Sequence, residues 1–218
     1  MKIRDKIAKI KKIHSIVSST LFFVVLIFCI FNAKELNLTE TSLSNYGIND
    51  KTGYIWNISL FILGILLYLH ALRNIFRYYS SAQISSRLVL SFTISSLCLL
   101  LTASIDMSYK IHDSFAVSYF IGYIVSIFLF GYKLLNTDFR IGISSILISI
   151  CCLVFPILTT YLFKGWAIPE IIHTLFILIW VIMLSFDTEY KNLIKKIGFY
   201  IYEMENNKIN SSKPFSKN

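Results

Sequence analysis

The feature that most constrains the fold is a long run without charged side chains, Ile13 to Ala33, which reads IHSIVSSTLFFVVLIFCIFNA. Because an α-helix rises about 1.5 Å per residue, about 20 apolar residues cross a hydrocarbon core of about 30 Å. The run therefore predicts a membrane-spanning helix. Five further apolar runs have a similar length: Tyr54 to Leu72, Leu88 to Ser104, Ser114 to Leu135, Ile141 to Phe163 and Ala167 to Phe186. The predicted fold is an all-α, six-transmembrane-helix bundle.

The composition agrees with a polytopic membrane protein. Of the 218 residues, 56% are hydrophobic and 15% are charged, against about 25% charged in soluble domains. We expect one domain without a soluble module. The cysteines lie inside apolar runs without CxxC or metal-ligand spacing, so we interpret them as small buried hydrophobes. They are Cys29, Cys98, Cys151 and Cys152.

Both ends of the chain are basic and amphipathic. Residues 2–12, KIRDKIAKIKK, carry six basic groups and one acid, and their isoleucines fall on one helix face. This pattern predicts a helix on an anionic lipid surface, with a frayed basic tail as the alternative. The predicted division of the chain is a basic amphipathic segment over 1–12, a transmembrane domain over 13–186, a cytoplasmic amphipathic helix over 187–205 and a disordered tail over 206–218.

Lysine and arginine predict the orientation. With six spans both termini lie on one side, and that side receives 17 of the 21 basic residues. The other side receives Lys34, Lys51, Lys110 and Lys164. The positive-inside rule then places the termini in the cytoplasm and the protein in the cell membrane. The net charge of +9 is therefore interpreted as an orienting charge, and no nucleic-acid partner is expected.

Small residues recur inside one predicted span. Ser118, Gly122 and Ser126 are spaced four apart, which favours close approach of a neighbouring helix. We interpret this stripe as a packing feature.

No catalytic motif is present, since the chain lacks GxSxG, HExxH, Walker and GxGxxG patterns. The topology instead places several polar residues together at the outer ends of the spans. Asp106 ends the third span, while His112 and Asp113 open the fourth and Glu170 and His173 open the sixth. Asn57 and the loop residues Ser44 and Asn45 lie at the same depth and complete a possible outer pocket.

Three interpretations of this cluster stay open. The side chains of Asp106, His112, Glu170 and His173 could hold a catalytic Zn²⁺ or act as an acid–base pair. Ser44, Asn57 and Asp113 could bind a ligand or a lipid head group. Alternatively, the residues only stabilise helix ends, where the dipole favours carboxylates in the first turn. No cofactor is predicted outside the zinc alternative.

Three functions follow from these interpretations. The first is a non-enzymatic bundle that binds a lipid or small ligand, or that contacts a membrane-protein partner or a second copy of itself. The second is a metal-dependent membrane lipid hydrolase that uses the outer cluster. The third is a small transporter.

Short motifs resemble a known family. The stretch LSNYGINDKTGYIWNISLFILGILL, His112 at the fourth span and Pro169-Glu170 with Trp180 in the sixth resemble the bacterial family called domain of unknown function 998. Its layout is similar to that of the eukaryotic DRAM-type autophagy modulators. The resemblance covers about residues 15–186, implies a six-span membrane protein and implies no established reaction.

Overall fold

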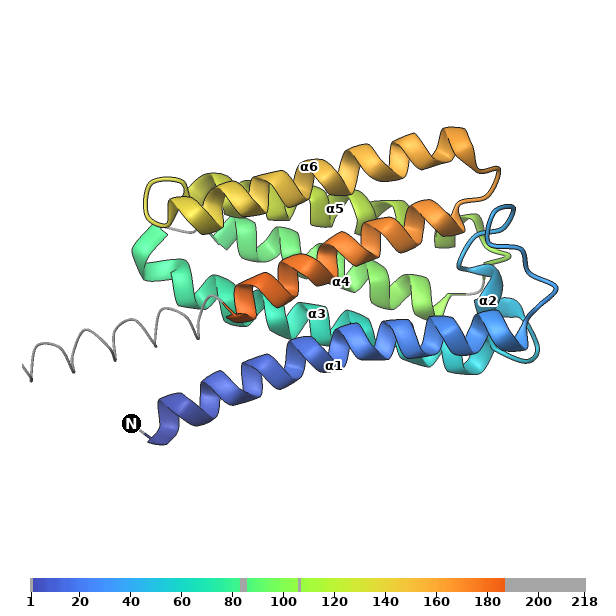
Figure 1. Cartoon of the computed structure of the whole chain (residues 1–218), viewed down its shortest axis with the longest axis horizontal. Coiled ribbons are helices and arrows are strands. Elements are labelled where there is room, and N and C mark those ends of the chain that lie inside the picture. Colours follow the sequence, from blue (N-terminus) through green and yellow to red (C-terminus); the bar gives the residue numbers. More distant parts are fainter. Residues whose placement is uncertain (1, 83–85, 106, 187–218) are drawn as a thin grey trace, which may run out of the picture.

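The computed structural model describes residues 2–82, 86–105 and 107–186. This part of the chain is helical and contains no strand. A last helix without a label in Figure 1, Ala167–Phe186, is called the last helix below. The labelled helices are α1 (Lys2–Asn32), α2 (Asn45–Ile48), α3 (Gly53–Ala82), α4 (Ser86–Ser104), α5 (Lys110–Leu134) and α6 (Phe139–Leu162).

Six of these helices are long and apolar enough to cross a bilayer, which confirms the predicted all-α membrane bundle. Two helices extend beyond the predicted spans. α1 begins at Lys2, so residues 2–12 and the first span form one continuous helix. α3 continues to Ala82, ten residues past the predicted end at Leu72. A helix satisfies its own backbone hydrogen bonds, so it need not end where the hydrocarbon ends.

The predicted position of residues 1–12 on a lipid surface stays a prediction. The predicted helix over 187–205 and the tail over 206–218 lie outside the described residues.

The helices run back and forth between two ends of the bundle (Figure 1). The N-terminus and the α5–α6 connection lie at one end. At the other end, here called the loop end, the α1–α3 connection with α2 meets the connection from α6 to the last helix. The even number of spans brings the end of the last helix back toward the N-terminal end, as Figure 1 shows.

Trp180 of the last helix is the centre of the packed interior. Its side chain is fully buried and stacks on Phe92 of α4, with ring centroids 5.4 Å apart and an interplanar angle of 12°. Phe130 of α5 meets the indole edge-on at 5.6 Å. The indole Nε1–H donates to Ser145 Oγ of α6 at 3.0 Å. One side chain thus joins four spans, and its polar atom is satisfied, as a buried indole requires.

Small residues bring α4 and α5 close together. A Cβ added at Gly122 would overlap the Ser95 side chain, and Ser126 Oγ lies 2.6 Å from Ser91 Oγ. Ser118, the third member of the predicted stripe, is exposed. Packing at Gly122 and Ser126 agrees with the predicted role, which the exposed Ser118 does not share.

Candidate functional site

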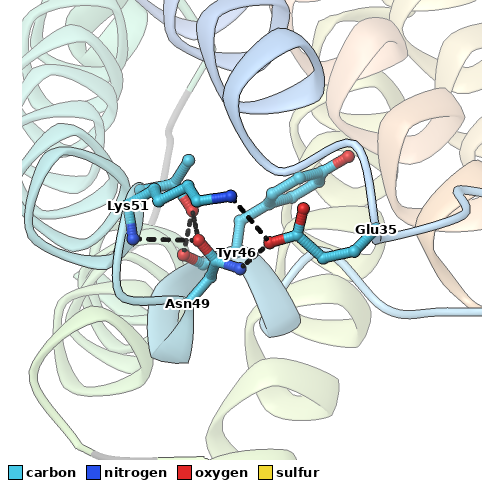
Figure 2. A network of polar contacts seen from close by, with 5 residues as sticks. Glu35, Tyr46, Asn49 and Lys51 are labelled. Atoms are coloured by element: carbon cyan, nitrogen blue, oxygen red, sulfur yellow. Dashed lines mark hydrogen bonds and ion pairs between the residues drawn. The ribbon is translucent and has the colours of Figure 1, made fainter.

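The α1–α3 connection is a folded cap at the loop end. Glu35 lies at its start and binds two residues near its end (Figure 2). Asn49 Nδ2 donates to Glu35 Oε1 at 2.9 Å, and Lys51 Nζ lies 3.7 Å from the same oxygen. A backbone hydrogen bond at Glu35, followed by the bond from Asn49, holds the pKa of this exposed carboxyl below its usual range. These contacts close the connection into a loop.

Tyr46 of α2 anchors the cap to the bundle. Its side chain is fully buried, and its ring centroid lies 5.6 Å from that of Trp56 in α3. Thr52 Oγ1 donates to the Tyr46 carbonyl at 2.8 Å, and Asn57 Nδ2 donates to the Gly47 carbonyl at 3.0 Å. Burial raises the pKa of the Tyr46 phenol. Asn57, predicted as a ligand-binding residue, therefore supports the cap.

Two consecutive residues of the cap bind two different helices. The backbone N–H of Leu43 donates to Glu170 Oε2 of the last helix at 2.7 Å. Ser44 Oγ lies 2.9 Å from His112 Nε2 of α5. Leu43 and Ser44 thus link Glu170 and His112, two of the polar residues that were predicted to meet at this end.

The hydrogen bonds of His112 define its tautomer. Its Nδ1 lies 2.9 Å from the Ile105 carbonyl, which can only accept, so Nδ1 carries the hydrogen. In the neutral ring Nε2 then accepts from the Ser44 hydroxyl. The ring is buried with both nitrogens engaged, so His112 acts here as a connector between α4, α5 and the cap.

A polar pocket of about 210 Å³ lies beneath this cap and is lined by Ser44, Asn57 and His112 among others. These three residues belong to the predicted outer cluster. Whether they bind a ligand stays a prediction.

A second hollow opens on the side of the bundle, between α5, α6 and the last helix; it is called the lateral groove below. Its volume is about 240 Å³ and its lining is almost entirely apolar. Cys152 and His173 on its wall are buried. The exposed lining residues are Val117, Ile121, Leu153, Ile157 and Trp166.

Among the described residues that line this groove, Glu170 is the acidic side chain and His173 is the histidine. They lie three apart on one helix face, as the sequence predicts. His173 Nδ1 lies 3.1 Å from the Cys152 carbonyl, so Nδ1 donates. Nε2 is buried and makes no hydrogen bond to the described residues.

A small cavity of about 50 Å³, called the internal cavity below, is lined by Leu43 and Ser44 among others. Glu170 lines both this cavity and the lateral groove. Trp56 and Tyr119 line the cavity as well, and their Nε1 and hydroxyl groups are buried without a partner among the described residues.

The predicted zinc cluster divides between these places. His112 faces the polar pocket, whereas Glu170 and His173 line the lateral groove. In the part of the chain that the structure describes, no group of three His, Cys, Asp or Glu side chains could hold a metal ion. Asp113 is exposed, and Asp106 lies outside the described residues.

The comparisons with known proteins bear on the family. The model of a family described as "Protein of unknown function (DUF998)" matches residues 16–187. The chain belongs to this family. The match spans all six candidate membrane helices, which agrees with the resemblance seen in the sequence. No curated protein and no solved structure matches the chain.

Sequence reasoning missed Tyr119, Trp166 and Cys152 as groove and cavity residues. Aromatic and cysteine side chains inside apolar runs give no signal that separates a binding wall from ordinary packing. The sequence also gave no sign that the backbone N–H of Leu43 binds Glu170, because every residue except proline carries such a donor.

Proposed function

We propose that this membrane protein is not an enzyme and that it binds a lipid-like amphiphile from the bilayer in the lateral groove. The observation that carries the proposal is a groove with an exposed apolar rim and two ionisable side chains, Glu170 and His173, on its wall. Ionisable groups within a membrane span are costly, so their presence in a groove that opens toward lipid favours a specific site.

The groove suits one chain better than a whole lipid. Its volume of about 240 Å³ lies below the roughly 300–1,000 Å³ of pockets that enclose drug-sized ligands. An acyl or alkyl chain could lie along Ile121 and Ile157, with the remainder of the molecule in the bilayer. A membrane-protein partner or a second copy of the chain is the competing occupant.

The orientation is part of the proposal. The six-span topology assigns 17 of the 21 basic residues to the side that holds both termini, and this bias supports cytoplasmic termini in a cell membrane. The basic residues of 2–12 would then lie near the anionic lipids of the inner leaflet. The cap and the polar pocket would lie on the outer side.

Native mass spectrometry of the full chain released from detergent tests the proposal. We expect the protein to retain one amphiphile. Ile121→Trp fills the rim of the groove and should abolish this retention, because Ile121 is 57% exposed there. Leu147→Trp is the matched control, since Leu147 is 55% exposed on α6 and does not line the groove.

Equal retention in the two variants, or no bound amphiphile in the unaltered protein, would contradict the proposal. A groove that crosslinks to a second protein chain and carries no lipid would favour the competing occupant.

A further inference from the structure

Two buried polar atoms lie on neighbouring rings where the internal cavity and the lateral groove meet: Tyr119 lines the cavity, His173 lines the groove, and Glu170 lines both. Tyr119 of α5 and His173 of the last helix are each 3% exposed, and their ring centroids lie 6.3 Å apart. Neither the Tyr119 hydroxyl nor His173 Nε2 makes a hydrogen bond of normal geometry within the described residues, and the side chain of Thr174, which lines the same cavity, is the polar neighbour of the Tyr119 hydroxyl. A buried polar group without a partner is costly, so two of them on adjacent rings indicate that something binds both.

The two atoms have complementary roles. His173 Nδ1 must donate to the Cys152 carbonyl, which leaves Nε2 as an acceptor in the neutral ring. The Tyr119 hydroxyl can donate. A ligand group that satisfies both atoms must accept one hydrogen bond and donate another, and a hydroxyl is the smallest such group on a lipid.

The surroundings argue against charged head groups. Among the described residues that line the groove and the internal cavity there is no lysine or arginine, while Glu170 lines both. A phosphate or carboxylate would therefore meet a carboxyl group without a compensating cation. An ammonium group has no lone pair to accept from Tyr119.

We propose that the amphiphile bound in the lateral groove carries an uncharged hydroxyl head group. This group accepts a hydrogen bond from Tyr119 and donates one to His173 Nε2, while its chain lies in the groove. The inference rests on the proposed function and adds the chemical class of the ligand.

The test compares three probes with the same chain: dodecanol, dodecylamine and dodecyl phosphate, each titrated into the full-length protein in native mass spectrometry. We expect dodecanol to bind about tenfold more tightly than the other two, the size expected for one to two net hydrogen bonds. Tyr119→Phe should weaken dodecanol binding about three- to tenfold and leave dodecylamine binding unchanged, because an ammonium group cannot accept from Tyr119. Tyr132→Phe is the matched control, because Tyr132 lies on the same helix and is 60% exposed.

The outcomes separate the two proposals. If no probe binds, the proposed function fails. If all three bind equally, or if Tyr119→Phe keeps the preference for dodecanol, the groove takes a chain only and the head-group inference is wrong. Tyr119→Phe removes a hydroxyl without a partner, so its unfolding temperature should stay close to that of the unaltered protein. His173→Phe removes the acceptor and provides a second variant with the same expected loss.

Discussion

The backbone N–H of Leu43 donates a hydrogen bond to Oε2 of Glu170 at 2.7 Å, across 127 positions of the chain. Glu170 lies in the first turns of the last helix and also lines the lateral groove and the internal cavity. The same carboxyl group therefore holds the cap and forms part of the proposed binding wall. Ordering of the cap and occupation of the groove are expected to influence each other through this side chain.

Glu170→Ala should destabilise the protein by about 1–3 kcal/mol, because the buried N–H of Leu43 loses its acceptor. Glu170→Gln should cost less, since the amide oxygen can still accept. Thermal unfolding in one detergent compares the two variants. Equal losses would show that the charge of Glu170, and not its acceptor geometry, stabilises the cap.

Ser44→Ala should cost about 1–3 kcal/mol for a related reason. It removes the donor to His112 Nε2 and leaves a buried ring nitrogen unpaired. Ser114→Ala, an exposed position in the same first turns of α5, should change stability by less than about 0.5 kcal/mol. Chemical denaturation of both variants measures the difference, and a Ser44→Ala protein as stable as the control would contradict the role assigned to His112.

Hydropathy predicts the membrane fold well because the bilayer allows few solutions for a backbone. Runs such as Ile13 to Ala33 and Ala167 to Phe186 are expected to be helical, and both are, except that α1 ends at Asn32, one residue before Ala33. Hydropathy indicates the apolar part of a helix and not the residue at which the helix ends, so the extension of α3 to Ala82 was not predicted.

The candidate site was predicted only in part. The sequence indicates that Ser44, Asn57 and His112 share one end of the bundle, and the structure lines one pocket with them. The sequence could not show that Glu170 and His173 line a different hollow, because that depends on how the last helix is rotated against α5 and α6. The relative rotation of helices is determined by side-chain packing between them, and this packing cannot be predicted from one apolar run alone.

Gly165→Ala should loosen the cap. An added Cβ would overlap the backbone of Glu40 and Thr41, and backbone atoms cannot move aside as a flexible side chain can. Two backbone hydrogen bonds at this contact would be disturbed: Gly165 N–H to the Thr39 carbonyl at 2.8 Å and Ala167 N–H to the Thr41 carbonyl at 2.9 Å.

We expect Gly165→Ala to cost about 1–3 kcal/mol, the usual range for overpacking. Limited proteolysis should also cut residues 34–52 faster than in the unaltered protein. Lys164→Ala changes the neighbouring exposed residue and should leave both measurements unchanged. Unaltered proteolysis in Gly165→Ala would mean that the connection to the last helix does not hold the cap.

The proposed orientation predicts a labelling pattern at two exposed lysines on opposite ends of the bundle. Lys51 lies in the cap with a side chain that is 64% exposed, and Lys133 lies in the last turn of α5. A membrane-impermeant maleimide should label Lys51→Cys in intact cells and Lys133→Cys only after permeabilisation. The four native cysteines lie within spanning helices, and the parent protein measures their background. The reverse pattern would place the cap and the polar pocket on the cytoplasmic side. The proposal for the lateral groove does not depend on which way the bundle is oriented.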